Sequence, residues 1–450
     1  MAKAKQVPKK KPSVPALFGR LRKHFGTDPA KLPVIEQGFQ IYDRANLHLT
    51  LEELLATAAP VLVGIVLPHQ HADVTLAKLS RPTIAKGYEE GPVEYADVQL
   101  TGDQKLACVK KGLYTFRDGD RPVALLVTEA PTYARSEGII VSVMAPSREA
   151  AEAFTRKLAK GVKYGTAFRG KVLSVEQDCF RRTTVRFHQL PKVARASLIL
   201  PEVLLRRIER QALGLSKHAD ALRAAGRHLK RGILMHGKPG TGKTLSAMYL
   251  AAQVPGRTVL VLTGHAMGSI ETACALARLL EPATIVLEDV DLIGTERHNQ
   301  TVGANALLFE LLNQMDGLAE DADILFVLTT NRPDFLEPAL AARPGRIDLA
   351  IEVPLPDEEC RRRLLELYGR GLELKLADPE VWVRRTKGAS AAFIRELLRK
   401  AAVVAAEDTG APTRGALVVT DRHLEEAAAE LLVAGGPLTK ALLGVADAAE

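Results

Sequence analysis

The stretch Gly237-Lys-Pro-Gly-Thr-Gly-Lys-Thr244 decides the fold of this 450-residue chain. It fits the pattern G-x-x-x-x-G-K-[ST], follows the apolar run Ile233–His236 and precedes the helical pattern Leu245–Gln253. Glycines let backbone N–H groups approach phosphates closely, and the start of a helix adds positive potential. The pattern therefore predicts a phosphate-binding loop between a strand and a helix. Its expected contacts are Gly237, Lys238, Pro239, Gly240, Thr241, Gly242, Lys243, Thr244 and Leu245.

Two side chains of this loop carry the expected chemistry. Lys243 supplies a point charge to the β- and γ-phosphates of a nucleoside triphosphate. Thr244 offers its hydroxyl group to Mg²⁺. A chance match in a glycine-rich turn is the alternative, and the strand and helix patterns on either side argue against it.

The run Thr284–Asp291 is predicted to be a buried strand that ends in carboxylates. Chemistry at a triphosphate needs one carboxylate near Mg²⁺ and another to orient or deprotonate the attacking water. The simplest register gives Glu288 the metal role and Asp289 the water role, although such strand ends normally carry Asp before Glu. A second register gives Asp289 the metal and puts Val290 where the base should be. A third interpretation is a charged strand end that caps the next helix.

Polar residues also follow the next apolar run, Ile324–Leu328. The amide of Asn331 would reach the γ-phosphate or the attacking water, and the alternative is a turn-forming Asn before Pro333. Arg343 and Arg346 lie three residues apart across a Pro-Gly turn. Either they form a solvated face or, as we expect here, they neutralise charge in the transition state.

These motifs share their order and spacing with one known family. Together they resemble an AAA-family ATPase of the AAA+ superfamily, over about Leu198–Leu432. The resemblance implies ATP and Mg²⁺ as cofactors and a homo-oligomeric ring, usually a hexamer, in which Arg343 and Arg346 complete the site of the neighbouring subunit. The segments that carry it are Gly237–Thr244, Glu288–Asp291, Asn305–Gly317, Asn331 and Arg343–Asp348, together with Gly388–Ile394, which is similar to the family's lid segment.

The chain also departs from the family's pattern. The acidic order is Glu288-Asp289, and Phe393 stands where the lid segment usually carries Asp. Protein-threading members have an aromatic pore loop after the second strand. This chain has Ala266-Met267-Gly268 there, which is short and has no aromatic residue.

The pattern of elements predicts an α/β fold with a small α+β domain before it. Apolar runs that alternate with helical patterns indicate a parallel P-loop sheet, an AAA+ core, and an all-helical lid follows from about Pro356. The runs Lys171–Val175 and Thr183–Phe187 are assigned to the N-terminal domain. The expected parts are a basic flexible tail (1–25), an N-terminal α+β substrate or adaptor domain (26–191), the AAA+ core (198–355), the helical lid (356–436) and a C-terminal tail (437–450).

The composition of the chain limits the cellular location and the kinds of partner that we expect. The chain has 61 Lys and Arg against 53 Asp and Glu, and eight of the basic residues lie in residues 1–25, which hold no acidic one. Residues 1–25 are therefore the one segment where contact with nucleic acid is possible. The alternative, which we favour, is that this basic segment is a solvated tail. Four scattered cysteines without a CxxC pair predict a reducing cytoplasm, and the longest aliphatic run is too short for a membrane span.

The leading hypothesis is a ring-forming ATPase that remodels a protein client or adaptor selected by the first 190 residues. One rival is an ATP-gated scaffold with weak hydrolysis, because Asp289 is one methylene shorter than the usual Glu. A second rival is an ATPase that remodels nucleic acid and is recruited by the basic arm. The identity of a client is not encoded in any motif.

Overall fold

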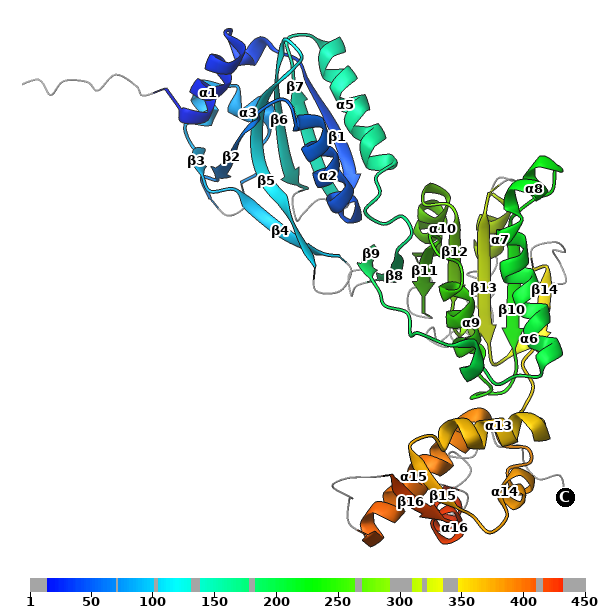
Figure 1. The fold of residues 1–450 in the computed structure, drawn as a ribbon. Helices are drawn as coiled ribbons and strands as arrows, with labels where there is room; N and C mark the ends of the chain where they lie inside the picture. The colour runs from blue at the N-terminus through cyan, green and yellow to red at the C-terminus, as the bar shows by residue number, and fades with distance from the viewer. Residues whose placement is uncertain are drawn as a thin grey trace, which may run out of the picture. The chain divides into compact units, whose positions relative to one another are not determined.

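The chain folds into two compact units in the computed structural model, Met1–Phe168 and Arg169–Glu450 (Figure 1). Each unit has its own sheet and its own hydrophobic core. The structure describes residues 14–69, 72–100, 104–130, 138–177, 183–263, 269–291, 310–317, 322–334, 347–409 and 416–431.

The first unit is built on an antiparallel sheet. Its strand order is β1-β7-β6-β5-β2-β3, and β4 pairs with the first half of β5. The strands span Val34–Gln40 (β1), Val61–Val66 (β2), Glu89–Gly91 (β3), Glu94–Gln99 (β4), Lys105–Asp118 (β5), Arg121–Glu129 (β6) and Gly138–Met144 (β7).

Helices pack on both faces of this sheet. Along β6, Val123 and Leu125 join the core under α2 (Arg44–Leu55) and α5 (Arg148–Lys163), whereas Leu126 joins a second core. The alternation follows from the two-residue period of a strand. The second core holds α1 (Ala16–Phe25) and α3 (Leu76–Leu79), with α4 (Pro82–Ala85) next to them. The predicted α+β character of this region is confirmed.

The predicted tail of residues 1–25 is wrong for its second half. Residues 16–25 form α1, and Leu17 and Leu21 are fully buried. These leucines lie four residues apart and therefore share one face of the helix. Arg20 donates to both carboxylate oxygens of Glu90 at 2.8 and 2.7 Å, so part of the basic excess is held by the fold.

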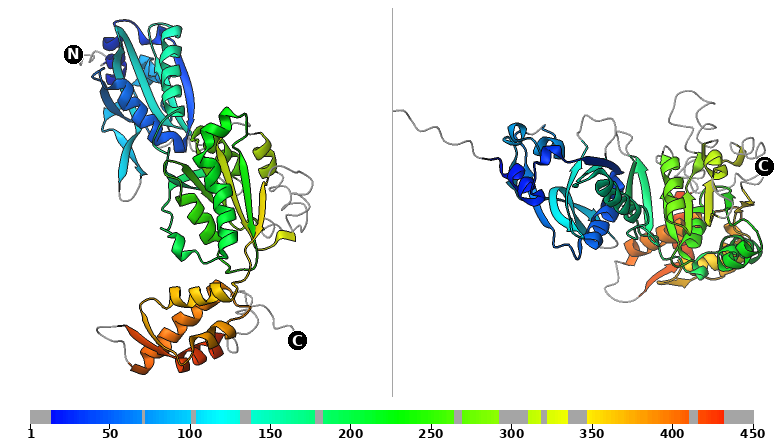
Figure 2. Two further views of the ribbon diagram at one scale, coloured as in Figure 1. Left: turned by 45° about the vertical axis from the view of Figure 1, so that its right-hand side comes forward. Right: turned by 90° about the horizontal axis from the view of Figure 1, so that it is seen from above.

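The second unit is built on a mainly parallel sheet, as the alternating pattern predicted (Figures 1 and 2). Its order is β14-β10-β13-β12-β11-β8-β9, and every neighbouring pair is parallel except β8 with β9. The strands span Val172–Gln177 (β8), Thr183–Phe187 (β9), Arg231–His236 (β10), Thr258–Leu262 (β11), Ala283–Leu287 (β12), Ile324–Thr330 (β13) and Leu349–Glu352 (β14).

The boundary expected at residue 191 lies elsewhere in the structure. Strands β8 and β9 had been assigned to the N-terminal domain, but β8 pairs with β11 and Leu173 lies opposite Leu260. The division between the two units falls between Phe168 and Arg169. Arg169 begins the second unit and is anchored within it, because its guanidinium donates to the carbonyl oxygens of Leu279 and Glu281.

Helices α6 (Glu202–Glu209) and α9 (Lys243–Ala252) cover one face of the parallel sheet. Leu205 and Ala247 pack there against Met235 and its neighbours. A π-helical turn joins α6 to α7 (Leu215–Lys217), which is followed by α8 (Ala219–Ala224). Helix α10 (Ile270–Leu279) packs on β11 and β12 with residues outside that core.

The lid is not all-helical. Its helices are α13 (Glu358–Tyr368), α14 (Pro379–Arg385), α15 (Ala391–Thr409) and α16 (Asp421–Ala429), and a parallel pair of four-residue strands, β15 (Leu372–Lys375) and β16 (Leu417–Thr420), lies among them. Trp382 and Phe393 fill its core, so Phe393 has a packing role. Among the described helices none, the 19-residue α15 included, is apolar and long enough to cross a bilayer.

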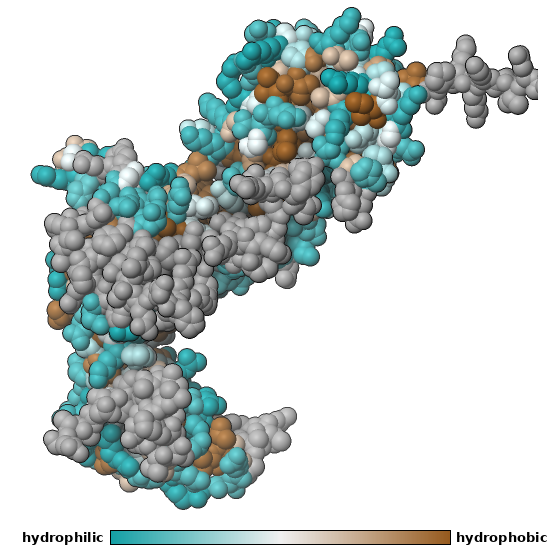
Figure 3. Space-filling view, turned by 180° about the vertical axis from the view of Figure 1, so that it is seen from behind, coloured by the Kyte–Doolittle hydropathy of each residue, from teal (hydrophilic) through white to brown (hydrophobic). Residues whose placement is uncertain are grey.

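Large apolar side chains reach the surface mainly on the first unit. Val61, Val66, Ile84, Tyr95 and Tyr164 are each at least 41% exposed. Apolar residues are visible on this unit between hydrophilic ones on the face drawn in Figure 3.

Because β8 belongs to the second unit, a substitution of Leu173, which is fully buried in β8, should destabilise that unit and not the first. Replacing a buried Leu by Ala removes about 2–5 kcal/mol of stability. In the full chain, Leu173→Ala should raise amide hydrogen exchange in β11 and leave β6 unchanged. The matched variant Leu125→Ala, in the core of the first unit, should do the reverse. Faster exchange in β5–β7 of the Leu173 variant would show that β8 belongs to the first unit.

Candidate functional site

The parallel strands bring three motifs to one edge of the sheet. Strand β10 lies between β14 and β13, and β13 lies between β10 and β12. Because the pairs β10–β13 and β12–β13 are parallel, their carboxyl ends meet at the same edge. The phosphate loop follows β10, Glu288 and Asp289 follow β12, and Asn331 follows β13.

The loop conformation depends on glycine. Gly237 has φ +145°, and a Cβ there would clash with the carbonyl oxygen of Val353. Gly240 has φ +73°, and a Cβ there would lie 2.7 Å from the Cβ of Ala392. The N–H of Ala392 donates to the carbonyl oxygen of Gly240 at 3.1 Å, so the lid contacts the loop directly.

Lys243 begins helix α9 and is buried. Its ammonium group donates to the carbonyl oxygens of Gly237 at 2.9 Å and Lys238 at 2.8 Å. Burial lowers the pKa of Lys243, and the negative charges of Asp289 and Asp291 oppose that effect. The loop thus wraps around a cation that faces two carboxylates.

Glu288 and Asp289 differ in their surroundings. The N–H of Glu288 donates to Leu262 O, and its buried Oε1 has no hydrogen-bond partner in the structure. Asp289 has φ +48°, a left-handed conformation that Asp tolerates better than most residues. Its N–H donates to Thr329 Oγ1 at 3.1 Å, and its Oδ1 accepts from Asn331 Nδ2 at 3.2 Å.

Burial raises the pKa of both carboxyls. For Glu288 the charge of Asp289 adds to the effect of burial. For Asp289 the charge of Asp291 adds to it, while Lys243 and the hydrogen bond from Asn331 lower the pKa. A cation bound beside the two carboxyls would stabilise their charged forms and lower both pKa values.

Asp291 holds Asn331 in place. Its Oδ1 accepts hydrogen bonds from Thr330 Oγ1 at 2.8 Å and from the N–H of Asn331 at 3.1 Å. The fixed backbone aims the Asn331 amide at Asp289. No role was expected for Asp291 from the sequence, although a carboxylate two residues after Asp289 was a visible signal.

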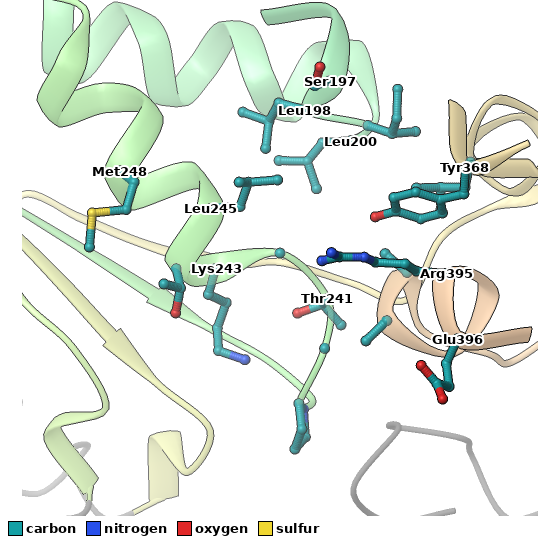
Figure 4. A pocket seen from close by; sticks show the side chains of 18 of the residues that line it. Ser197, Leu198, Leu200, Thr241, Lys243, Leu245, Met248, Tyr368, Arg395 and Glu396 are labelled. Carbon is teal, nitrogen blue, oxygen red and sulfur yellow. The ribbon is translucent and has the colours of Figure 1, made fainter. Parts of the chain in front are cut away.

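A cavity of about 710 Å³ lies between the loop and the lid (Figure 4). The loop, Asp289 and Asn331 line its polar side, and Leu198, Leu200 and Met248 contribute apolar surface. A cavity with one polar and one apolar side suits a nucleotide, which has a charged phosphate chain and a flat base.

The lid supplies wall residues that the sequence did not identify. Figure 4 shows Tyr368 and Arg395 extending from the lid toward the phosphate loop. Leu364 and Tyr368 share a face of α13 because they are four residues apart. That spacing was visible in the sequence, but the direction of the face was not.

The expected site residues divide into three groups. The residues Pro239 to Leu245, Asp289 and Asn331 line one cavity, and Thr244 is exposed in it. Gly237, Lys238 and Glu288 adjoin it, because Lys243 contacts the first two and Glu288 precedes Asp289. Arg343, Arg346 and the segment 264–268, which contains Met267, lie outside the described residues.

The oxygen atoms at this edge fit Mg²⁺. Mg²⁺ prefers oxygen ligands and is usually held by one or two protein groups together with phosphates. Thr244 presents an exposed hydroxyl, and Glu288 keeps a buried carboxylate oxygen without a partner. A metal nearby, directly or through water, would satisfy that oxygen.

Comparison with known proteins agrees with this geometry. Residues 233–355 match the model of the "ATPase family associated with various cellular activities (AAA)". The chain is 34% identical over 212 residues to a proteasome-activating nucleotidase of Thermococcus onnurineus, which covers 44% of this chain and 53% of that protein.

Two further relatives are similar to part of this chain. A 26S protease regulatory subunit 6A of Caenorhabditis elegans is 36% identical over 169 residues, 35% of this chain and 39% of that protein. The ATP-dependent zinc metalloprotease FtsH 2 of Symbiobacterium thermophilum is 33% identical over 238 residues, 50% and 39% respectively.

The chain thus spans about half the length of the nucleotidases that it matches. The matched stretch contains the phosphate loop, the acidic end of β12 and Asn331. The chain therefore contains an ATPase domain of the AAA family in residues 233–355.

Proposed function

We infer that the chain binds ATP with Mg²⁺ and hydrolyses it at the edge of the parallel sheet. The observation that carries this inference is the convergence of Lys243, Asp289 and Asn331 on one cavity from three neighbouring strands. Chemistry at a triphosphate consists mostly of positioning and charge stabilisation, and these three groups supply both.

Each residue has a proposed role. Lys243 binds the β- and γ-phosphates through its ammonium group, and Thr244 and Glu288 hold Mg²⁺, which neutralises developing phosphate charge when bound. Asp289 orients the attacking water and accepts its proton, since its carboxylate faces the cavity. Asn331 fixes that carboxylate through the 3.2 Å hydrogen bond.

The backbone favours this register over the one that puts Val290 at the base position. Asp289 lines the cavity, whereas Val290 is only 3% exposed. The left-handed backbone at 289 also suits Asp better than Glu. The inverted order Glu-Asp is therefore compatible with a water-activating group at position 289.

The proposed assembly is a homo-oligomeric ring, a hexamer, in which Arg343 and Arg346 reach the site of the neighbouring subunit. The relatives support this part of the proposal, together with the position of both arginines in the segment between β13 and β14. A guanidinium supplied in trans is worth about 10³–10⁵ in rate in other triphosphatases.

The proposed target is a protein, recruited through the first unit. We assign recruitment to the first unit because most of the described residues with exposed large apolar side chains lie there, among them Val61, Val66, Ile84 and Tyr95. The proposed location is the cytoplasm, which suits the buried free thiols of Cys108, Cys274 and Cys360.

Two substitutions separate binding from hydrolysis. Lys243→Ala should abolish both ATP affinity and turnover, because it removes the charge that faces the phosphates. Asp289→Asn should keep ATP affinity within threefold and reduce phosphate release by about 10²–10⁴-fold, the usual worth of a general base. Calorimetric titration and steady-state phosphate release measure the two effects. Wild-type turnover no higher than that of Lys243→Ala would favour a non-hydrolysing scaffold.

The contact between loop and lid is tested at Gly240. Gly240→Ala places a Cβ against Ala392 and should weaken ATP binding at least tenfold, because the lid must move away from the loop. Gly256→Ala is the matched control, since its φ of +80° carries the same backbone strain but its Cβ meets nothing. Equal ATP affinities of the two variants, measured with a fluorescent ATP analogue, would mean that the lid contact does not support binding.

Shared sites are tested by mixing inactive subunits. Arg346→Ala should bind ATP normally and lose turnover, because it removes the guanidinium supplied to the neighbouring site. Asp289→Asn should also bind ATP and lose turnover, because it removes the group that activates water in its own site. Mixed rings contain some interfaces with an intact Arg346 next to an intact Asp289, so phosphate release should recover partly. Mixtures as inactive as the separate variants would leave no support for a site shared between subunits.

A further inference from the structure

Charge is segregated within the second unit. This uneven distribution is not visible in the totals for positions 26–450, which are 53 basic and 53 acidic residues. Residues 169–231 hold 15 Lys and Arg against five Asp and Glu, and residues 232–450 hold 22 against 31. The positive segment contains β8, β9 and the helices α6–α8.

Several basic residues along α6–α8 are exposed. Arg207 and Arg210 are exposed on α6 and the π-helical turn, opposite the buried Leu205 and Ile208. Lys217 ends α7, and the exposed Arg227 follows α8. From residue 207 to 217 the helical path covers about 15 Å.

These four side chains, Arg207, Arg210, Lys217 and Arg227, lack acidic partners. Other basic residues of the segment are paired: Arg195 with Glu202 and Glu209, and Arg223 with Asp220. In the part of the chain that the structure describes, none of the four forms an ion pair. Their charges are therefore available to an external anion.

We propose that this surface, the α6–α8 basic face, binds the phosphate backbone of nucleic acid. It is distinct from the ATP site, because none of its four residues lines the nucleotide cavity. It is also distinct from residues 1–25, the segment to which the sequence had restricted nucleic-acid contact.

The shape of the face favours a phosphate polymer. About 15 Å of helix spans roughly four base pairs at 3.4 Å each, so repeated phosphates meet repeated cations. Arginine suits this contact because its planar guanidinium pairs with phosphate oxygens. Of the apolar residues on α6, Leu205 and Ile208 are buried in the core and Val203 is 83% exposed, and one exposed valine is a small apolar surface for insertion into lipid. No aromatic residue lies on α6–α8, so the binding should not depend on base sequence.

The test is the salt dependence of DNA binding by the full chain. Fluorescence anisotropy with a labelled 30-base-pair duplex gives the affinity between 0.05 and 0.2 M salt. Arg207→Ala with Arg210→Ala should reduce the slope of log K against log salt by about 2, and the affinity by roughly 60-fold at 0.1 M. ATP affinity should stay unchanged, which shows that the variant is folded.

The matched control is Lys86→Ala with Lys160→Ala, two exposed lysines of the first unit. It makes the same change in net charge and should bind DNA like the wild type. In a chain that lacks residues 2–13, the difference between the two double variants should persist.

Three results would overturn the proposal. The first is an equal slope for the two double variants. The second is a loss of binding on deletion of residues 2–13 alone. The third is an arginine variant that changes the sedimentation of the assembly and keeps its DNA binding. The last result would assign the α6–α8 basic face to a contact between subunits. Each of these outcomes leaves the proposed ATP site untouched, because that site is measured by phosphate release.

Discussion

The parallel pairing of β10, β13 and β12 is the constraint on which the site depends. It places the ends of three strands side by side, with His236 level with Thr330 and Leu287 level with Leu328. The phosphate loop, the carboxylates and Asn331 each begin within a few residues of those ends. A shift of one residue in either pairing would turn alternate side chains to the other face and separate the groups.

The lid depends on the same edge through a small contact. Gly240 and Ala392 meet through a 3.1 Å hydrogen bond, and a Cβ at Gly240 would lie only 2.7 Å from the Cβ of Ala392. Tyr368 and Arg395 then close the cavity from the lid (Figure 4). A nucleotide held between loop and lid would contact both, so binding and lid position are coupled by geometry.

The sequence predicted what local patterns determine. The phosphate loop and the strands around it follow from glycine spacing and apolar runs. The sequence did not predict the features that depend on pairing between segments far apart in the chain. The apolar run Val172–Val175 suits any sheet, and only the pairing with β11 assigns it to the second unit. The strands β15 and β16 are four residues long, too short for a clear pattern. A net charge also hides where charges gather, as on α6–α8.

The most direct test of the central claim is an experimental structure of the full chain with a slowly hydrolysed ATP analogue and Mg²⁺. The account predicts the triphosphate on the loop, with the γ-phosphate near Lys243 and Asn331. It also predicts Mg²⁺ about 2.1 Å from Thr244 Oγ1. A nucleotide bound elsewhere, or an Asp289 carboxylate turned away from the γ-phosphate, would contradict it.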